Sequence, residues 1–178
     1  ESPWSLKDAL AVARELEELG VYWMEEPLHR ADRAGMRALR EATDVRVAGG
    51  EMTRELHEFR DLVTGGCLDV LQPDAALVGG ITGLRRGALM AQEHNLVFPP
   101  HTWTNGMGVI ANAHLTAGLA DAPWLEYPFD PPEWGLDRRD YMLAEPLRVA
   151  ADGWIVLGDA PGMGYALDED LLARTRTG

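Results

Sequence analysis

The stretch VYWMEEP, residues 21–27, joins a short apolar run to an acidic pair and a proline. Four apolar residues in a row are typical of a buried parallel strand, because neither face of such a strand meets water. The proline ends the strand, so Glu25 and Glu26 stand at its carboxyl end. An acidic pair before a turn is by itself more often solvated than functional. The stretch predicts a buried strand that places carboxylates at its end.

Similar apolar runs alternate with helical patterns along the rest of the chain, as expected for parallel strands joined by crossover helices. We expect strands at residues 21–24, 46–48, 68–71, 96–98 and 124–125. Ser5 is placed to cap a first helix, and Gly20 is placed to end it after Leu19. Further helices are expected near residues 31–42, 53–64, 82–94 and 106–119. The predicted fold class is therefore α/β.

An ionisable residue follows each predicted strand. These residues recur about every 25 positions, and they are Glu25, Glu51, Asp74, His101 and Glu126. In a (β/α)₈ barrel the active site is built from residues at the carboxyl ends of successive strands, so groups spaced by one unit converge in space. A complete barrel takes roughly 250 residues, whereas this chain has 178. We expect about five units of a barrel, with the five groups facing one cavity.

The regular pattern stops after Glu126. Prolines mark residues 127–135 as a loop, and residues 147–149 and 154–157 are expected to form a hairpin across Ala151-Asp152-Gly153. This tail is expected to belong to another layer of the protein.

Two of the strand-end carboxylates are candidates for a metal site. Glu25 and Glu51 lie one unit apart, and their hard oxygens are the ligands that Mg²⁺ prefers. Two ligands alone are a weak signal. For Glu51 an equally good alternative is an acidic residue at a helix N-terminus, where the helix dipole favours it.

The next two groups have the chemistry of a proton-transfer pair. A carboxylate at Asp74 can hold the Nδ1 proton of His101 and leave Nε2 as a base. Glu126 lies among bulky apolar neighbours, which disfavour its charged form and can keep it a proton donor. Each residue also has a plain alternative: Asp74 as a cap, His101 as a loop histidine in water, and Glu126 as a solvated strand end.

Composition excludes several classes of protein. The 46% apolar and 25% charged content is that of an ordinary globular core and surface. The net charge of −13 repels nucleic acid and anionic membranes. A single cysteine, Cys67, excludes an internal disulfide, and no apolar run approaches the roughly 20 residues that a membrane span needs. We therefore expect a cytoplasmic protein with no nucleic-acid or membrane partner.

Taken together in order, the motifs resemble the enolase superfamily, and within it the mandelate racemase (mandelate racemase/muconate lactonizing enzyme) subgroup. No single motif is specific, but the ordered set at unit spacing is, and it covers nearly the whole chain. The motifs are WMEEP at 23–27, AGGE at 48–51, QPD at 72–74 with GGIT at 79–82, PHT at 100–102, WLE at 124–126 and PGMG at 161–164.

The resemblance implies the C-terminal part of a modified (β/α)₇β barrel of TIM type. It implies that Glu25 and Glu51 are Mg²⁺ ligands, that Asp74 and His101 form the base dyad, and that Glu126 is a hydrogen-bonding acid beside the substrate carboxylate. The family pattern also selects the first glutamate of the acidic pair, rather than the second, as the ligand.

Some features of the family pattern are missing from the 178 residues. The resemblance implies an aspartate ligand on the preceding strand and a lysine one strand earlier, but the sequence contains neither, and its one lysine is Lys7 on a predicted helix. Trp4-Ser5-Leu6 resembles the stretch just after that aspartate, so we expect the chain to begin immediately after a ligand. We expect residues 1–137 to form the partial barrel and residues 138–178 to pack toward a capping domain.

The activity implied is Mg²⁺-dependent abstraction of the proton α to a carboxylate, with dehydration of a sugar acid to a 2-keto-3-deoxy acid as the favoured reaction. The partner is then a small-molecule carboxylate, and the enzyme is expected to be a homo-oligomer. Two alternatives stay open. One is a racemase or epimerase of a hydroxy acid or amino-acid derivative, and the other is a catalytically incomplete fragment that serves as a binding or structural module.

Overall fold

The computed structural model describes residues 4–120, 122 and 124–176, and its centre is a set of short parallel strands. Within that part of the chain, three strands form one sheet in the order β1 (Trp23–Glu25), β2 (Arg46–Gly49) and β3 (Val70–Leu71). Met24 pairs with Val47, and Ala48 pairs with Val70. Val97 continues the series through one parallel bridge to Val70. The strands expected at 21–24, 46–48 and 68–71 are confirmed, and the one at 96–98 is reduced to this bridge.

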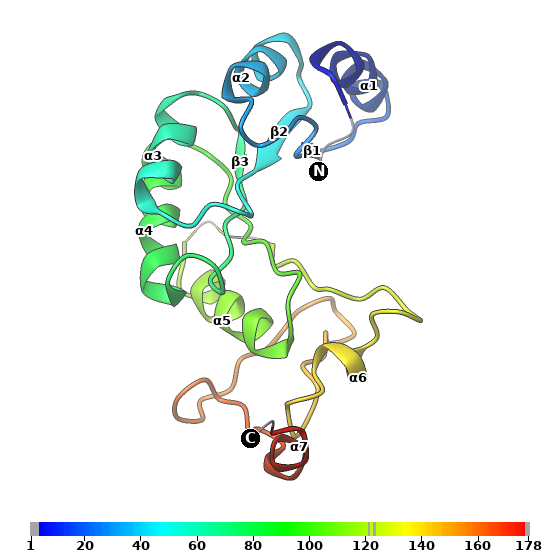
Figure 1. The fold of residues 1–178 in the computed structure, drawn as a ribbon, viewed down its shortest axis with the longest axis vertical. Coiled ribbons are helices and arrows are strands. Elements are labelled where there is room, and N and C mark those ends of the chain that lie inside the picture. Colours follow the sequence, from blue (N-terminus) through cyan, green and yellow to red (C-terminus); the bar gives the residue numbers. More distant parts are fainter. Residues whose placement is uncertain (1–3, 121, 123, 177–178) are drawn as a thin grey trace.

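Seven helices form in the described residues, and the first five of them lie on the outer side of the strands. They are α1 (Leu6–Glu18), α2 (Arg33–Ala42), α3 (Leu56–Thr64), α4 (Gly80–Glu93), α5 (Gly106–Ala117), α6 (Leu136–Arg139) and α7 (Glu169–Thr175). Figure 1 shows α1 to α5 following one another in an arc, with the strands on its inner side. Strands on the inside and helices on the outside, alternating along much of the chain, form part of an α/β barrel. The five expected helices are confirmed, whereas α6 and α7 had no counterpart in the sequence analysis.

The first helix has the boundaries that its sequence indicates. The Ser5 side chain accepts a hydrogen bond from the backbone N–H of Asp8, and the Asp8 carboxylate accepts one from the backbone N–H of Ser5. This reciprocal pair is a capping box, which satisfies two otherwise unpaired donors. After the helix, Gly20 adopts φ +70°, a left-handed conformation that glycine tolerates best. Both predicted ends of α1 are confirmed.

Two predicted β elements do not form. Residues 124 and 125 belong to no strand; instead the Trp124 ring packs edge to face on Trp23 at 5.5 Å and on Tyr22 at 5.0 Å. The hairpin expected from residues 147–149 and 154–157 is also wrong. Its turn exists, since the N–H of Ala150 donates to the carbonyl of Trp154, but the flanking residues form no ladder in the described chain. Residues with strand propensity form a strand only where a neighbouring strand supplies backbone hydrogen bonds.

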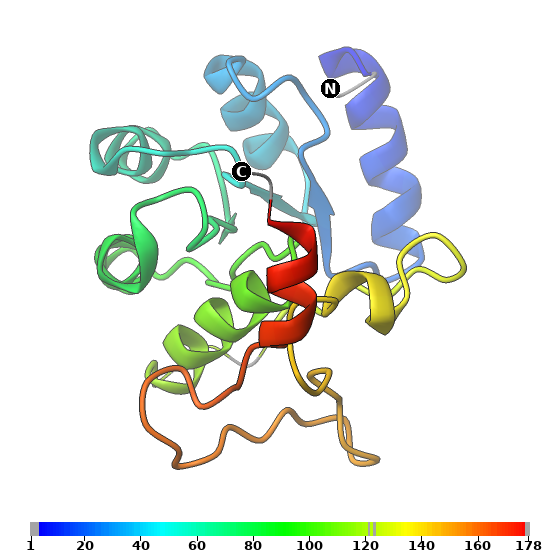
Figure 2. The same cartoon turned by 60° about the horizontal axis from the view of Figure 1, so that its bottom comes forward.

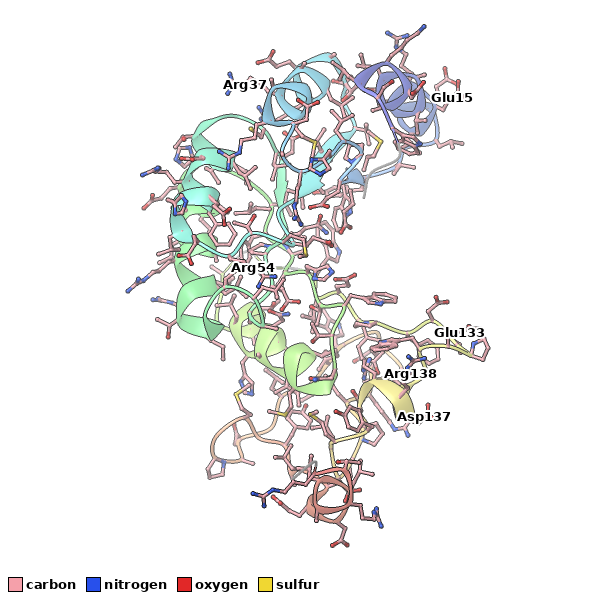
Figure 3. All side chains as sticks on the ribbon, in the orientation of Figure 1. Glu15, Arg37, Arg54, Glu133, Asp137 and Arg138 are labelled. Carbon is pink, nitrogen blue, oxygen red and sulfur yellow. The ribbon has the colours of Figure 1, made fainter. Side chains whose placement is uncertain are left out.

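The main core fills the space between the strands and α1 to α4. Its fully buried members include Leu39 of α2, Val47 of β2, Phe59 of α3, Leu71 of β3 and Leu84 of α4. Apolar burial of this kind supplies the main driving force for folding. Charged side chains such as Glu15 of α1 and Arg37 of α2 project outward from the helices, as Figure 3 shows. The core therefore holds the helices against the strands, and the functional side chains lie beyond it at the carboxyl ends of the strands.

A smaller core attaches the C-terminal segment to α5. Val109 and Ile110 of α5 pack with Leu143 and Leu147, and all four are buried. Figure 2 shows the orange C-terminal segment lying beside α5. The boundary expected between residues 137 and 138 stays a prediction.

A buried ion pair lies at the centre of this attachment. The Arg139 guanidinium bonds to Asp140 at 2.6 and 2.8 Å and donates to the carbonyls of Pro128 and Leu147. It also lies over the Tyr127 ring, 4.0 Å from its centroid. A buried charge is tolerated only when it is paired and hydrogen-bonded as completely as this.

Two further expectations concern single features. In the described residues no helix is both long enough and apolar enough to span a membrane. The Cys67 side chain is buried, and burial raises the pKa of its thiol. A buried cysteine of this kind packs as a small apolar side chain.

Candidate active site

The five predicted site residues all follow the carboxyl ends of the parallel strands or of the segments that continue them. Glu25 ends β1, Glu51 follows β2 by two residues, and Asp74 follows β3 by three. His101 follows the Val97 bridge, and its backbone N–H donates to the carbonyl of Pro73 at 3.1 Å. The His101 ring contacts both Glu51 and Asp74, so the structure brings these three side chains together.

The tightest relationship in the site is that between His101 and Asp74. Nδ1 of His101 lies 3.1 Å from Oδ2 of Asp74, and the Asp74 side chain is fully buried. An ionised carboxylate can only accept hydrogen bonds, so the proton of this contact belongs to Nδ1 of the imidazole. Such a bond fixes both the orientation of the ring and its tautomer. The predicted pairing of Asp74 with His101 is present.

The second ring nitrogen of His101 contacts another carboxylate. Nε2 of His101 lies 3.2 Å from Oε2 of Glu51. Burial lowers the pKa of His101, but the hydrogen bond to Asp74 and the charges of Glu126, Glu51 and Asp74 raise it, and the net effect is a raised pKa. The ring is thus surrounded by groups that stabilise the imidazolium, the form that exists after a base has taken up a proton.

Glu126 lies on the next segment and is held by the loop that carries His101. One of its carboxylate oxygens accepts a hydrogen bond from the backbone N–H of Thr102. Burial raises the pKa of Glu126, whereas the Thr102 bond and the charge of His101 lower it, and the pKa is raised overall. A carboxyl group with a raised pKa is suited to hold and donate a proton.

The candidate metal ligands are Glu25 and Glu51. Glu25 is exposed, and its Oε2 accepts a hydrogen bond from Nε2 of Gln72 at 3.1 Å. The amide oxygen of Gln72, Oε1, is buried without a hydrogen-bond partner. Two carboxylates at adjacent strand ends are hard donors that suit Mg²⁺, which keeps several waters or substrate oxygens in its shell. In the described part of the chain, no group of three or more His, Cys, Asp or Glu side chains is arranged to hold a metal ion.

The second glutamate of the acidic pair has a structural environment of its own. Glu26 adopts φ +38°, and its Oε1 accepts a hydrogen bond from the N–H of Gly50 at 3.4 Å. Gly50 has φ +109°, where a side chain would be strained. Burial raises the pKa of Glu26, and the charges of Glu51 and Glu25 act in the same direction. Glu26 therefore supports the turn that presents Glu51.

Asn112 is a further residue of the site that no sequence motif indicates, and it is fully buried on α5. Its Nδ2 donates toward Oδ1 of Asp74 at 3.2 Å, the carbonyl of His101 at 2.8 Å and Oγ1 of Thr102 at 3.2 Å. Its Oδ1 accepts from the backbone N–H of Ala75 at 3.0 Å. An asparagine inside a helical pattern carries no distinctive sequence signal, apart from being a polar residue among apolar ones.

The arrangement provides a base with an oriented ring, a carboxyl group with a raised pKa, and two hard oxygen ligands at neighbouring strand ends. Together these groups can remove a proton from carbon and stabilise the negative charge that results.

Comparison with known proteins identifies the family to which the chain is similar. The profile described as enolase C-terminal domain-like matches residues 1–171. L-talarate/galactarate dehydratase of Salmonella typhimurium is 31% identical over 166 residues, which are 93% of this chain and 38% of that protein. D-galactarolactone cycloisomerase of Agrobacterium fabrum is 27% identical over 178 residues, or 97% of this chain and 47% of that protein. The chain spans less than half the length of these curated relatives.

Among solved structures, one of L-talarate dehydratase from Polaromonas sp. JS666, complexed with Mg and L-glucarate, superposes with a TM-score of 0.84. Its sequence is 29% identical, and the alignment covers 99% of this chain and 46% of that one.

Proposed function

The chain belongs to the enolase C-terminal domain-like family, and on that premise we propose that it supplies the proton-transfer groups for Mg²⁺-dependent abstraction of the proton α to a carboxylate. The favoured reaction is dehydration of a sugar acid to a 2-keto-3-deoxy acid, which makes the enzyme a lyase. One observation carries the proposal: the fully buried Asp74 holds Nδ1 of His101 at 3.1 Å. That bond leaves Nε2 as the only ring nitrogen able to take a proton from substrate.

The choice of a sugar-acid dehydratase rests on the relatives. The Salmonella typhimurium protein is named for two six-carbon diacids, and the Polaromonas structure holds Mg and L-glucarate. Both names indicate a small polyhydroxy carboxylate as the substrate class.

In the proposed reaction, Nε2 of His101 takes the α-proton of the bound acid. Asp74 keeps the ring in place and stabilises the imidazolium as it forms. Glu126, held by the N–H of Thr102, donates a hydrogen bond to the substrate carboxylate as its charge increases. When the β-carbon carries a hydroxyl, that group leaves as water with the proton that His101 has taken up, which restores the neutral imidazole, and the resulting enol tautomerises to the 2-keto acid.

The α-proton of a carboxylate is far too weakly acidic for an imidazole alone, so charge stabilisation is needed. Glu25 and Glu51 are the residues of this chain that would hold Mg²⁺, and a bound divalent cation stabilises an enediolate as a Lewis acid.

A second candidate is an isomerase. The Agrobacterium fabrum relative is named as a cycloisomerase, and racemisation shares the same first step. A racemase needs a base on each face of the α-carbon, whereas this chain supplies one candidate base, His101. Dehydration needs a base on one face only, and it is the preferred proposal because the Salmonella typhimurium and Polaromonas relatives are named as dehydratases.

The test uses the full-length protein with Mg²⁺ and a panel of six-carbon acid sugars in D₂O. We expect the parent to form 2-keto acid and to exchange the α-proton, and we expect His101→Asn to lose both. His57→Asn is the matched control, because His57 is an exposed histidine on α3. Stereochemical inversion without keto acid favours the racemase, and full activity in His101→Asn removes His101 from the mechanism. A homo-oligomeric state and a cytoplasmic location stay predictions.

A further inference from the structure

The buried amide of Asn112 connects three segments that are far apart in sequence. It bonds to the Asp74 carboxylate and the Ala75 N–H after β3, and to the carbonyl of His101 and the hydroxyl of Thr102 in the next loop. Asn112 itself lies on α5, which begins at an Asn105 cap. One side chain therefore joins the segment of the dyad carboxylate to the segment of the dyad imidazole.

These contacts require a carboxamide. Oδ1 of Asn112 accepts a hydrogen bond from the Ala75 N–H, while Nδ2 donates to the Asp74 carboxylate and the His101 carbonyl. A carboxamide of this length provides both functions. Leucine has the right size but removes all four of these hydrogen bonds, which is costly where the groups are buried. An ionised aspartate faces the Asp74 carboxylate with no hydrogen to donate.

The contacts also determine what the reacting groups can do. Oδ1 of Asp74 is occupied by Asn112 and by the N–H of Ala76 at 2.9 Å, so Oδ2 is directed to Nδ1 of His101. On the other side, Thr102 accepts from Asn112 through its hydroxyl and donates to Glu126 through its backbone N–H. The positions of the base and of the acid thus depend on the same amide.

We propose that Asn112 is a positioning residue that holds the Asp74–His101 dyad and the Glu126 carboxyl group in one fixed arrangement. The inference rests on the function proposed above and goes beyond it, because it assigns a residue that touches no reacting atom. Asn112 acts through Asp74, His101 and Thr102.

The first measurement is spectroscopic and requires no substrate. In full-length protein labelled with ¹⁵N-histidine, the Nδ1 proton of His101 that bonds to Asp74 should give a low-field ¹H resonance, assigned by its loss in His101→Asn. We expect Asn112→Leu and Asn112→Asp to lose this resonance or move it upfield. Thr116→Ala is the matched control, because the Thr116 hydroxyl donates to the backbone carbonyl of Asn112 and not to its side-chain amide, and it should keep the parent resonance.

The second measurement separates positioning from folding. Well below the unfolding temperature of each variant, we expect α-proton exchange to fall on the order of 10- to 100-fold, the usual effect of removing a residue that orients a reacting group. The KM should stay close to that of the parent. Because Asn112→Asp keeps the size of the side chain and the acceptor for Ala75, it provides a folded variant if Asn112→Leu does not fold.

The outcomes are distinct. An unchanged resonance and unchanged exchange in folded Asn112→Asp overturn the inference while leaving the proposed function standing. If the parent shows no turnover of any acid sugar, the proposed function fails, but loss of the resonance in the Asn112 variants still supports the positioning of the dyad. The inference about Asn112 is also overturned if the variants lose activity only in proportion to their unfolded fraction and their folded molecules keep the parent resonance.

Discussion

Nε2 of His101 lies 3.2 Å from Oε2 of Glu51, so the nitrogen proposed to take the substrate proton is in contact with a proposed metal ligand. The charge of Glu51 is one of the groups that raise the pKa of His101. We expect Glu51→Gln to lower the pKa of His101, because the charge is removed and the size is kept. The measurement is an NMR titration of the His101 ring in the full-length protein. Glu55→Gln, at an exposed position four residues later, should leave this titration unchanged.

Because the pKa of Glu126 is raised, we expect the stability of the protein to depend on pH. Burial raises its pKa in the folded state above the ordinary value of 4.5, so ionisation opposes folding. The contribution of the neutral carboxyl is fully present below pH 4.5 and is lost as the pH rises through the higher folded value. We expect Glu126→Gln, which keeps an acceptor for Thr102, to melt at a higher temperature than the parent at pH 8 and at the same temperature near pH 4. An equal difference at both pH values would contradict the prediction.

The proposed metal site distinguishes the two glutamates of the acidic pair, because Glu25 is a proposed ligand and Glu26 is not. Titration calorimetry on the full-length protein should show that Glu25→Gln and Glu51→Gln each weaken Mg²⁺ binding by at least about 10-fold, the loss typical even of an outer-shell partner. Glu26→Gln should bind Mg²⁺ like the parent, because its proposed role is to support the Gly50 turn through an oxygen that glutamine keeps. Loss of binding in Glu26→Gln alone would assign the ligand to the second glutamate.

The ion pair between Arg139 and Asp140 predicts a large effect on stability. Arg139→Met leaves Asp140 buried without its partner, a change that typically costs about 3–5 kcal/mol. Urea unfolding measures the loss. Arg138→Met, at the exposed neighbouring position labelled in Figure 3, should change stability by less than about 1 kcal/mol. Equal losses in the two variants would show that the buried pair has no special role.

Much of the site was predictable because the repeated strand–helix units place an ionisable residue at regular intervals in the sequence. One ionisable residue per unit located His101 and its partner Asp74, although 27 positions separate them. Asn112 was not predictable, because its partners become neighbours only when α5 packs against the strand ends. The strand expected at residues 124–125 failed for a similar reason, since apolar residues form a strand only beside a hydrogen-bonded neighbour.

The edge-to-face contact between Trp23 and Trp124 also has a consequence for folding kinetics and for its detection. The two rings belong to segments near opposite ends of the strand series, so this contact closes a long loop. Contacts of high sequence separation form slowly, because the chain must lose much entropy before they stabilise it. Paired indole rings held at a fixed angle give a near-ultraviolet circular dichroism signal of their own. In refolding, that signal should appear after the far-ultraviolet signal of the helices and should report when the segment of Trp124 packs against β1.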